Sequence, residues 1–130
     1  MVLDTSALIA LLLGEPSAPR LAAAVQASPA RYVSVASVLE TALVMQARVG
    51  EQGDLEVDAL LRELELDVVP VDAEQLRLAR DAAVGFGKGR HPAALNYGDL
   101  FSYGLAASLG EPLLCTGGDF AQTDVALAAY

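Results

Sequence analysis

The chain has 130 residues, of which 54% are hydrophobic and 19% are charged, and its formal net charge at pH 7 is -9. This length fits one domain, residues 1–130, with a sizeable core, and the composition excludes a disordered tail or linker. The negative charge argues against binding nucleic acid through a basic surface alone. It still allows an enzyme that acts on nucleic acid, because a bound divalent cation can offset local carboxylates.

The first apolar run, Ala7–Leu13, is too short to cross a bilayer as a helix. Asp4 precedes it, whereas a signal peptide carries positive charge at that place. One cysteine, Cys115, excludes an internal disulfide, and no Cys/His cluster offers a zinc site. We therefore expect a cytoplasmic protein without a membrane-spanning segment.

Short β-type runs alternate with longer helical ones along the chain. In chain order, the pattern predicts a strand at Val2–Leu3, helices at Thr5–Leu13 and Ala18–Ala27, a strand at Tyr32–Val35, helices at Ala36–Val49 and Leu55–Leu66, and a strand at Val68–Val71. A helix capped by Asp72 follows to about Val84, then a Gly-rich loop, a helix capped by Asn96 to about Leu109, a strand at Leu113–Cys115 and a short strand near Val125–Leu127. Such alternation predicts a parallel sheet covered by helices on both faces, with ligands bound at the carboxyl ends of the strands.

Four acidic residues are predicted to meet at that edge of the sheet. Asp4 directly follows the first strand, and Asp119 lies in the turn after the last apolar strand. Glu40 and Asp99 lie in the first turns of helices that begin there. The topology therefore brings four carboxylates together.

Each acid also has a purely structural explanation. Glu40 can complete a capping box with Ser37, and Asp99 stands in a similar relation to Asn96. Asp4 can cap the first helix, and Asp119 can be an ordinary turn residue. Against these readings, Glu40 shares a helix face with apolar residues, Leu43, Val44 and Ala47, where a lone carboxylate is costly.

A hard divalent cation resolves the repulsion between close carboxylates. Mg²⁺ or Mn²⁺ suits a site of carboxylates and waters, lowers the pKa of bound water, and stabilises charge on a phosphoryl oxygen. Metal-assisted phosphodiester hydrolysis is the reaction class that this arrangement predicts.

The acidic segments resemble those of PIN-domain proteins, especially the VapC-type toxins of toxin–antitoxin pairs. The similarity covers essentially the whole chain and lies in Met1–Leu8, Ala36–Thr41, Leu95–Tyr103 and Leu113–Phe120. It implies a three-layer α/β/α sandwich around a parallel sheet and Mg²⁺- or Mn²⁺-dependent RNA cleavage. Gly118 departs from the family pattern, since many relatives carry Asn or another polar residue before the last acid.

The resemblance also implies roles for individual residues. Asp4 and Asp99 would be the main metal ligands, with Glu40 and Asp119 completing the pocket directly or through water. Supporting hydroxyls are expected from three residues, Thr5, Ser6 and Thr116. A homodimer is implied, as is a VapB-type antitoxin whose C-terminal segment wraps the toxin and approaches the pocket. Any exposed part of the apolar N-terminal helices would form a groove for an antitoxin helix.

The Gly-rich loop carries the one basic cluster, Lys88, Arg90 and His91. We expect Lys88 and Arg90 to contact the RNA backbone, whereas a ligand or general-base role for His91 is disfavoured. Tyr97 and Tyr103 flank Asp99, and core packing or hydrogen bonding explains them more simply than base stacking. Cys115 is expected to be a small buried hydrophobic residue.

Two other functions compete with the ribonuclease. A catalytically silent PIN-like module would bind a partner or RNA without cleaving it, although four intact acids argue against this. A Mg²⁺-dependent phosphatase would need a second acid beside Asp4 and a lysine late in the sheet. Thr5 and Ser6 follow Asp4 instead, and the only lysine, Lys88, lies in the loop.

Overall fold

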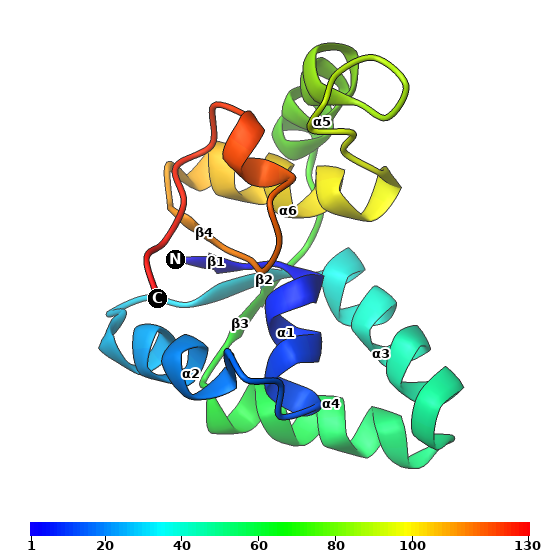
Figure 1. The fold of residues 1–130 in the computed structure, drawn as a ribbon, viewed down its shortest axis with the longest axis vertical. Coiled ribbons are helices and arrows are strands. Elements are labelled where there is room, and N and C mark those ends of the chain that lie inside the picture. Colours follow the sequence, from blue (N-terminus) through cyan, green and yellow to red (C-terminus); the bar gives the residue numbers. More distant parts are fainter.

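The computed structural model describes residues 1–130 and forms a parallel sheet with helices on both faces (Figure 1). The strands are β1 (Val2–Leu3), β2 (Tyr32–Ser34), β3 (Asp67–Val69) and β4 (Leu113–Leu114). The helices are α1 (Thr5–Leu12), α2 (Ala18–Ala27), α3 (Val35–Val49), α4 (Gln52–Glu63), α5 (Ala73–Phe86) and α6 (Tyr97–Leu109), with a 3₁₀ turn at Phe120–Gln122. The predicted three-layer α/β/α sandwich is confirmed.

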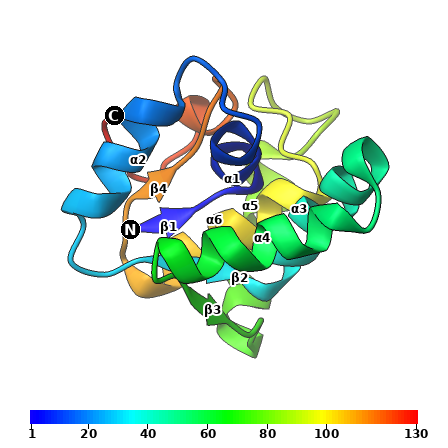
Figure 2. The same ribbon diagram turned by 90° about the horizontal axis from the view of Figure 1, so that it is seen from below.

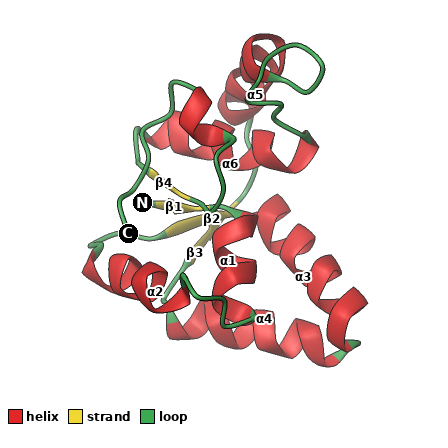
Figure 3. Cartoon of the chain, in the orientation of Figure 1, coloured by secondary structure: helices red, strands yellow, loops and turns green.

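The strands lie in the order β3-β2-β1-β4, and all neighbouring pairs are parallel. β1 therefore lies inside the sheet, although it begins the chain. Seen from below, α4 runs across the sheet on the same side as α1 and α2 (Figure 2). Figure 3 separates the short central strands from the surrounding helices by colour. All carboxyl ends of the strands consequently open at one edge.

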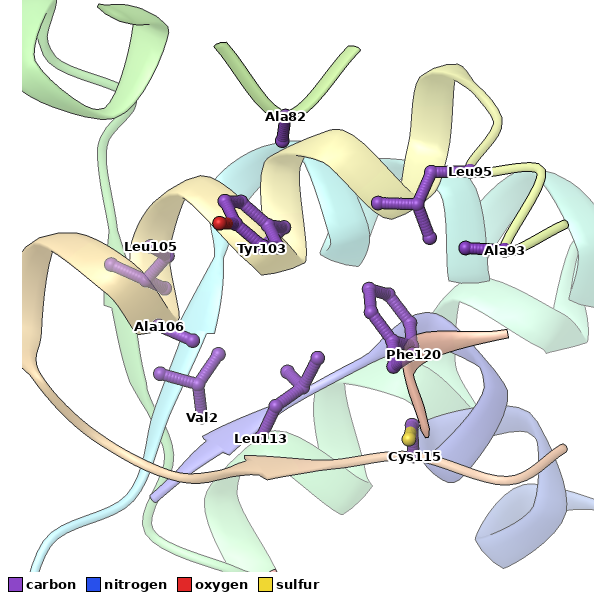
Figure 4. Packing of buried hydrophobic residues seen from close by; sticks show 10 residues of the cluster. All are labelled: Val2, Ala82, Ala93, Leu95, Tyr103, Leu105, Ala106, Leu113, Cys115 and Phe120. Carbon is purple, nitrogen blue, oxygen red and sulfur yellow. The ribbon is translucent and has the colours of Figure 1, made fainter. Parts of the chain in front are cut away.

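Two hydrophobic clusters hold the layers together, one on each face of the sheet. The first joins α5 and α6 to the strands, and Figure 4 shows Tyr103 and Leu105 of α6 above Val2 and Leu113. The second packs α1, α2 and the end of α4 against the opposite face, around Leu3, Leu8 and Leu21. Alternate side chains of β1 thus enter opposite cores, because successive residues of a strand point to opposite faces.

Several predicted boundaries are wrong by a few residues. Val35 starts α3 and does not end β2, because the Ser34 side chain accepts a hydrogen bond from the Ala36 N–H and caps the helix. α4 covers Gln52–Glu63 in place of 55–66, and α5 continues to Phe86. The predicted last strand is reduced to a single parallel bridge between Leu113 and Leu127.

No helix is long and apolar enough to span a membrane. The apolar α1 owes its composition to the core, since Ala7, Leu8 and Ala10 are all buried.

Candidate active site

Asp4 lies at the carboxyl end of β1, and its side chain caps the start of α1. Its Oδ2 accepts hydrogen bonds from the Ser6 N–H at 2.9 Å and from the Ser6 hydroxyl at 2.6 Å. Its Oδ1 is buried and has no hydrogen-bond partner, and the whole residue is 3% exposed. An unpartnered carboxylate oxygen at this depth is costly unless a cation or another donor satisfies it.

Ser6 links Asp4 to the loop that follows β4. The Ser6 Oγ, which donates to Asp4, also accepts the Thr116 N–H at 3.0 Å. The predicted support from Thr116 thus runs through its backbone, whereas Ser6 uses its hydroxyl. Together these contacts join the start of α1 to the loop after β4 at the edge where the acids lie.

Glu40 is held by the neighbouring hydroxyl. The Thr5 Oγ1 donates to Glu40 Oε2 at 2.7 Å, which joins α3 to the start of α1. The alternative capping box with Ser37 is wrong, because Ser34 caps α3 and places Ser37 inside the helix, where its hydroxyl contacts that of Ser102. Glu40 is partly exposed, as expected, but its apolar neighbour Leu43 is 56% exposed and does not bury it.

Asp99 both caps α6 and faces the other acids. Its Oδ2 accepts the Asn96 N–H at 2.8 Å while Asn96 Oδ1 accepts the Asp99 N–H at 3.0 Å, a complete capping box. The Asp99 pKa is raised to about 6, mainly by burial and then by the charges of Asp4, Asp119 and Glu40, against the lowering effect of the Asn96 bond. The four predicted acids are therefore electrostatic neighbours.

Asp119 lies at the exposed rim of this group, just before the 3₁₀ turn, with no side-chain capping bond. Beside it, the Cys115 thiol has its pKa raised to about 11 by burial and then by Asp4, Asp99 and Asp119. Cys115 is therefore an inert, buried thiol, as expected.

The residues present suit a hard cation. The donor set is entirely carboxylate, one buried oxygen lacks any partner, and the Asp99 pKa is raised by burial and then by its acidic neighbours. No three acidic, histidine or cysteine side chains lie close enough to ligate one ion together as they stand.

The Gly-rich loop between α5 and α6 presents its basic side chains to solvent. Lys88 and Arg90 are exposed, whereas His91 is partly buried and makes contacts within the loop. Its Nδ1 accepts the Ala93 N–H, and its ring packs edge-on against Phe86. His91 is thus a structural residue of the loop.

The two tyrosines beside Asp99 differ in role. The Tyr103 hydroxyl donates to Asp124 at 2.6 Å, and burial followed by this bond raises its pKa to about 12. Tyr97 is 80% exposed and packs only edge-to-face on Phe101, so the core reading of Tyr97 is wrong.

Sequence reasoning missed one close contact of the site. A Cβ built on Gly98 would lie 2.5 and 2.6 Å from the two carboxylate oxygens of Glu40. The available signal was a glycine in the first turn of a helix, where it is unfavourable relative to alanine.

The PIN domain profile matches residues 1–126 of the chain. Ribonuclease VapC30 of Mycobacterium tuberculosis is 55% identical over 99% of this chain and 98% of its own length. Ribonuclease VapC of Mycolicibacterium smegmatis is 52% identical over 97% and 98%.

Solved structures share the fold at much lower identity. Mycobacterium tuberculosis VapC20, described as a Sarcin-Ricin loop cleaving toxin, superposes with a TM-score of 0.76 at 22% identity, covering 95% of both chains. VapBC2 from Rickettsia felis, bound to a promoter DNA fragment, gives 0.76 at 13% identity over 97% of this chain and 94% of that one. On the strength of the profile and the close relatives, the chain belongs to the PIN-domain family and, within it, to the VapC ribonucleases.

Proposed function

We propose that this VapC protein is a Mg²⁺- or Mn²⁺-dependent endoribonuclease toxin that hydrolyses RNA phosphodiester bonds at its four-carboxylate site. The observation that carries the proposal is the buried, unpartnered Oδ1 of Asp4 beside Asp99, whose pKa is raised by burial and then by its acidic neighbours. Repulsion between these carboxylates makes the binding of a cation favourable.

Each acid has a part in this site. Asp4 and Asp99 would hold the ion through the oxygens left free by their helix caps, and Glu40 and Asp119 would complete the shell directly or through water. A bound Mg²⁺ or Mn²⁺ lowers the pKa of water and stabilises charge on a phosphoryl oxygen. Ser6 and Thr5 keep Asp4 and Glu40 oriented, so that the carboxylates need not reorganise during the reaction.

Lys88 and Arg90 supply positive charge that the acidic pocket lacks. Both are exposed on the loop that leads directly into Asn96 and α6. The ion pairs of arginine side chains elsewhere in the molecule involve Arg31 and Arg77, so Arg90 is free to meet a phosphate. We assign these two residues to the RNA backbone.

Two protein partners follow from the same proposal. The hollow beside α1, α2 and α4 is lined by apolar residues and by Glu15 and Glu63, which suits an amphipathic, basic segment of a VapB-type antitoxin. Solved relatives with this fold include a toxin–antitoxin complex from Klebsiella pneumoniae, at a TM-score of 0.72.

The second partner is another copy of the chain. We define the apolar face as Val35, Leu39, Leu43, Leu76 and Tyr97, all exposed on α3, α5 and α6. Tyr97 and Phe101 form a ridge on it, between a cleft of about 170 Å³ beside α5 and a hollow beside α3. A surface that offers both ridge and hollow can pair with itself about a two-fold axis.

The nuclease is tested by cleavage of a panel of structured RNAs with purified, antitoxin-free protein, in Mg²⁺, in Mn²⁺ and in chelator. Discrete fragments that require metal and disappear in Asp99→Asn are expected, since Asn can still cap α6 but is a poorer ligand. Lys88→Ala with Arg90→Ala should raise KM and leave metal affinity unchanged. No cleavage together with no metal-dependent rise in Tm would refute the proposal and favour a silent module.

A further inference from the structure

Gly98 lies where the first turn of α6 meets the side chain of Glu40 from α3. It is the second residue of the helix, between Tyr97 and Asp99, and its backbone is not in the left-handed region. Backbone freedom therefore does not explain a glycine at this position, which helix propensity disfavours.

A glycine is needed at position 98 because there is no space there for a side chain. The ideal Cβ position of Gly98 lies 2.5 Å from Glu40 Oε1, 2.6 Å from Oε2 and 2.8 Å from the carboxyl carbon. The carboxylate of Glu40 thus occupies the volume that any side chain at position 98 would fill. The Thr5 hydroxyl holds the same carboxylate at 2.7 Å, so Glu40 is confined between α1 and α6.

This seat lies next to a predicted metal ligand. Asp99 follows Gly98 directly, and the charge of Glu40 contributes to the raised pKa of Asp99. The carboxylate also lies near the amino end of α6, where the helix dipole favours negative charge. A side chain at 98 would push Glu40 away from Asp99 and from the bond to Thr5.

We propose that Gly98 is a positioning residue whose missing side chain seats the Glu40 carboxylate beside Asp99 and so sets the shape of the metal site. The inference rests on the proposed function for its effect on metal, but the seat itself is a property of the metal-free protein. It predicts that alanine at 98 is harmful only while Glu40 is present.

The first test is a double-mutant cycle on Tm in chelator. Gly98→Ala should lower Tm by about 1–3 °C, because the flexible end of Glu40 must move and lose its bond to Thr5. In a Glu40→Ala background it should leave Tm unchanged or raise it, because the clash is gone and alanine favours the helix. Gly85→Ala is the matched control, since that helical glycine in α5 has nothing within 4 Å of its Cβ position, and it should not lower Tm in either background.

The second test is Mn²⁺ binding, followed by the electron paramagnetic resonance of free Mn²⁺. Gly98→Ala should weaken affinity by about 10- to 100-fold, the range for lost supports of a metal site, while Gly85→Ala binds as the parent does. Glu40→Asp should partly restore Mn²⁺ affinity in Gly98→Ala, because the shorter side chain leaves room for the new Cβ. The same Glu40→Asp change should weaken affinity when Gly98 is present.

The outcomes separate the two proposals. Equal losses of Tm for Gly98→Ala in both backgrounds, or parental Mn²⁺ affinity in Gly98→Ala, would overturn the seat. The Tm cycle could show coupling between Gly98 and Glu40 while the parent protein binds no Mn²⁺. That result would support the positioning of Glu40 by Gly98 and refute the metal-dependent function.

Discussion

In Asp4 and Asp99, one carboxylate oxygen caps a helix while the other accepts no hydrogen bond from the protein. The cap fixes the side chain without help from the ligand, so the free oxygen is oriented before any ion arrives. The structural and functional explanations of these two acids are therefore compatible, because each explains a different oxygen.

The raised pKa of Asp99 predicts how the stability of the metal-free protein depends on pH. The folded pKa is about 6, above the ordinary value of 3.8, so the folded state binds this proton more tightly than the unfolded state does. Between about pH 4 and pH 6, stability contributed by this group falls as pH rises. We expect metal-free protein to melt at a higher temperature near pH 5 than near pH 7.5.

Asp99→Asn should reduce that difference, because the amide does not titrate. Asp58→Asn, an exposed change on α4, is the control and should leave it intact. The measurement is thermal unfolding in chelator at both pH values. An unchanged pH difference in Asp99→Asn would show that other groups control it.

Local sequence was sufficient for some residues of the site and insufficient for others. The caps of Asp4 and Asp99 could be predicted because donor and acceptor are two or three residues apart. The seat of Glu40 on Gly98 could not, since it depends on how closely α3 approaches α6. Long-range packing of this kind leaves no periodic signal in either segment.

At the scale of elements, α1, α2 and α4 form the hollow assigned to the antitoxin. Ala22→Arg should weaken binding of the cognate VapB-type antitoxin by at least about tenfold, because it puts bulk and positive charge where an apolar, basic segment docks. Ala23→Arg, exposed on the next position of α2 and outside the hollow, should bind normally. Calorimetry measures the affinity of each variant for the antitoxin. An equal loss of affinity in both variants would show that the antitoxin does not bind in this hollow.

Helices and strands were both predicted with errors at their ends, and α4 lies three residues earlier than predicted. α2 has the predicted bounds, since its apolar period and flanking residues agree. β2 was predicted one residue too long because Val35 has high strand propensity, yet Ser34 caps the helix there. β2 has only three residues, too few for sequence periodicity to show where the strand ends and the helix begins.

At the scale of the molecule, the apolar face predicts self-association. Leu43→Glu on α3 should convert a dimer to a monomer in sedimentation velocity, because it buries a charge in the contact. Leu55→Glu is the control, as Leu55 is 61% exposed on α4, away from this face. A monomeric parent protein, or a dimer that survives Leu43→Glu, would contradict the assignment.

The position of β1 inside the sheet has a consequence for synthesis. Asp4 is synthesised long before Leu114, but its N–H donates to the Leu114 carbonyl at 2.9 Å, and the Ser6 hydroxyl accepts the Thr116 N–H. A nascent chain therefore cannot close the acidic pocket until the segment after Leu113 has left the ribosome. Because Ser6 and Thr116 are 110 positions apart in the sequence, we expect the edge that carries the acids to be among the last parts of the molecule to form.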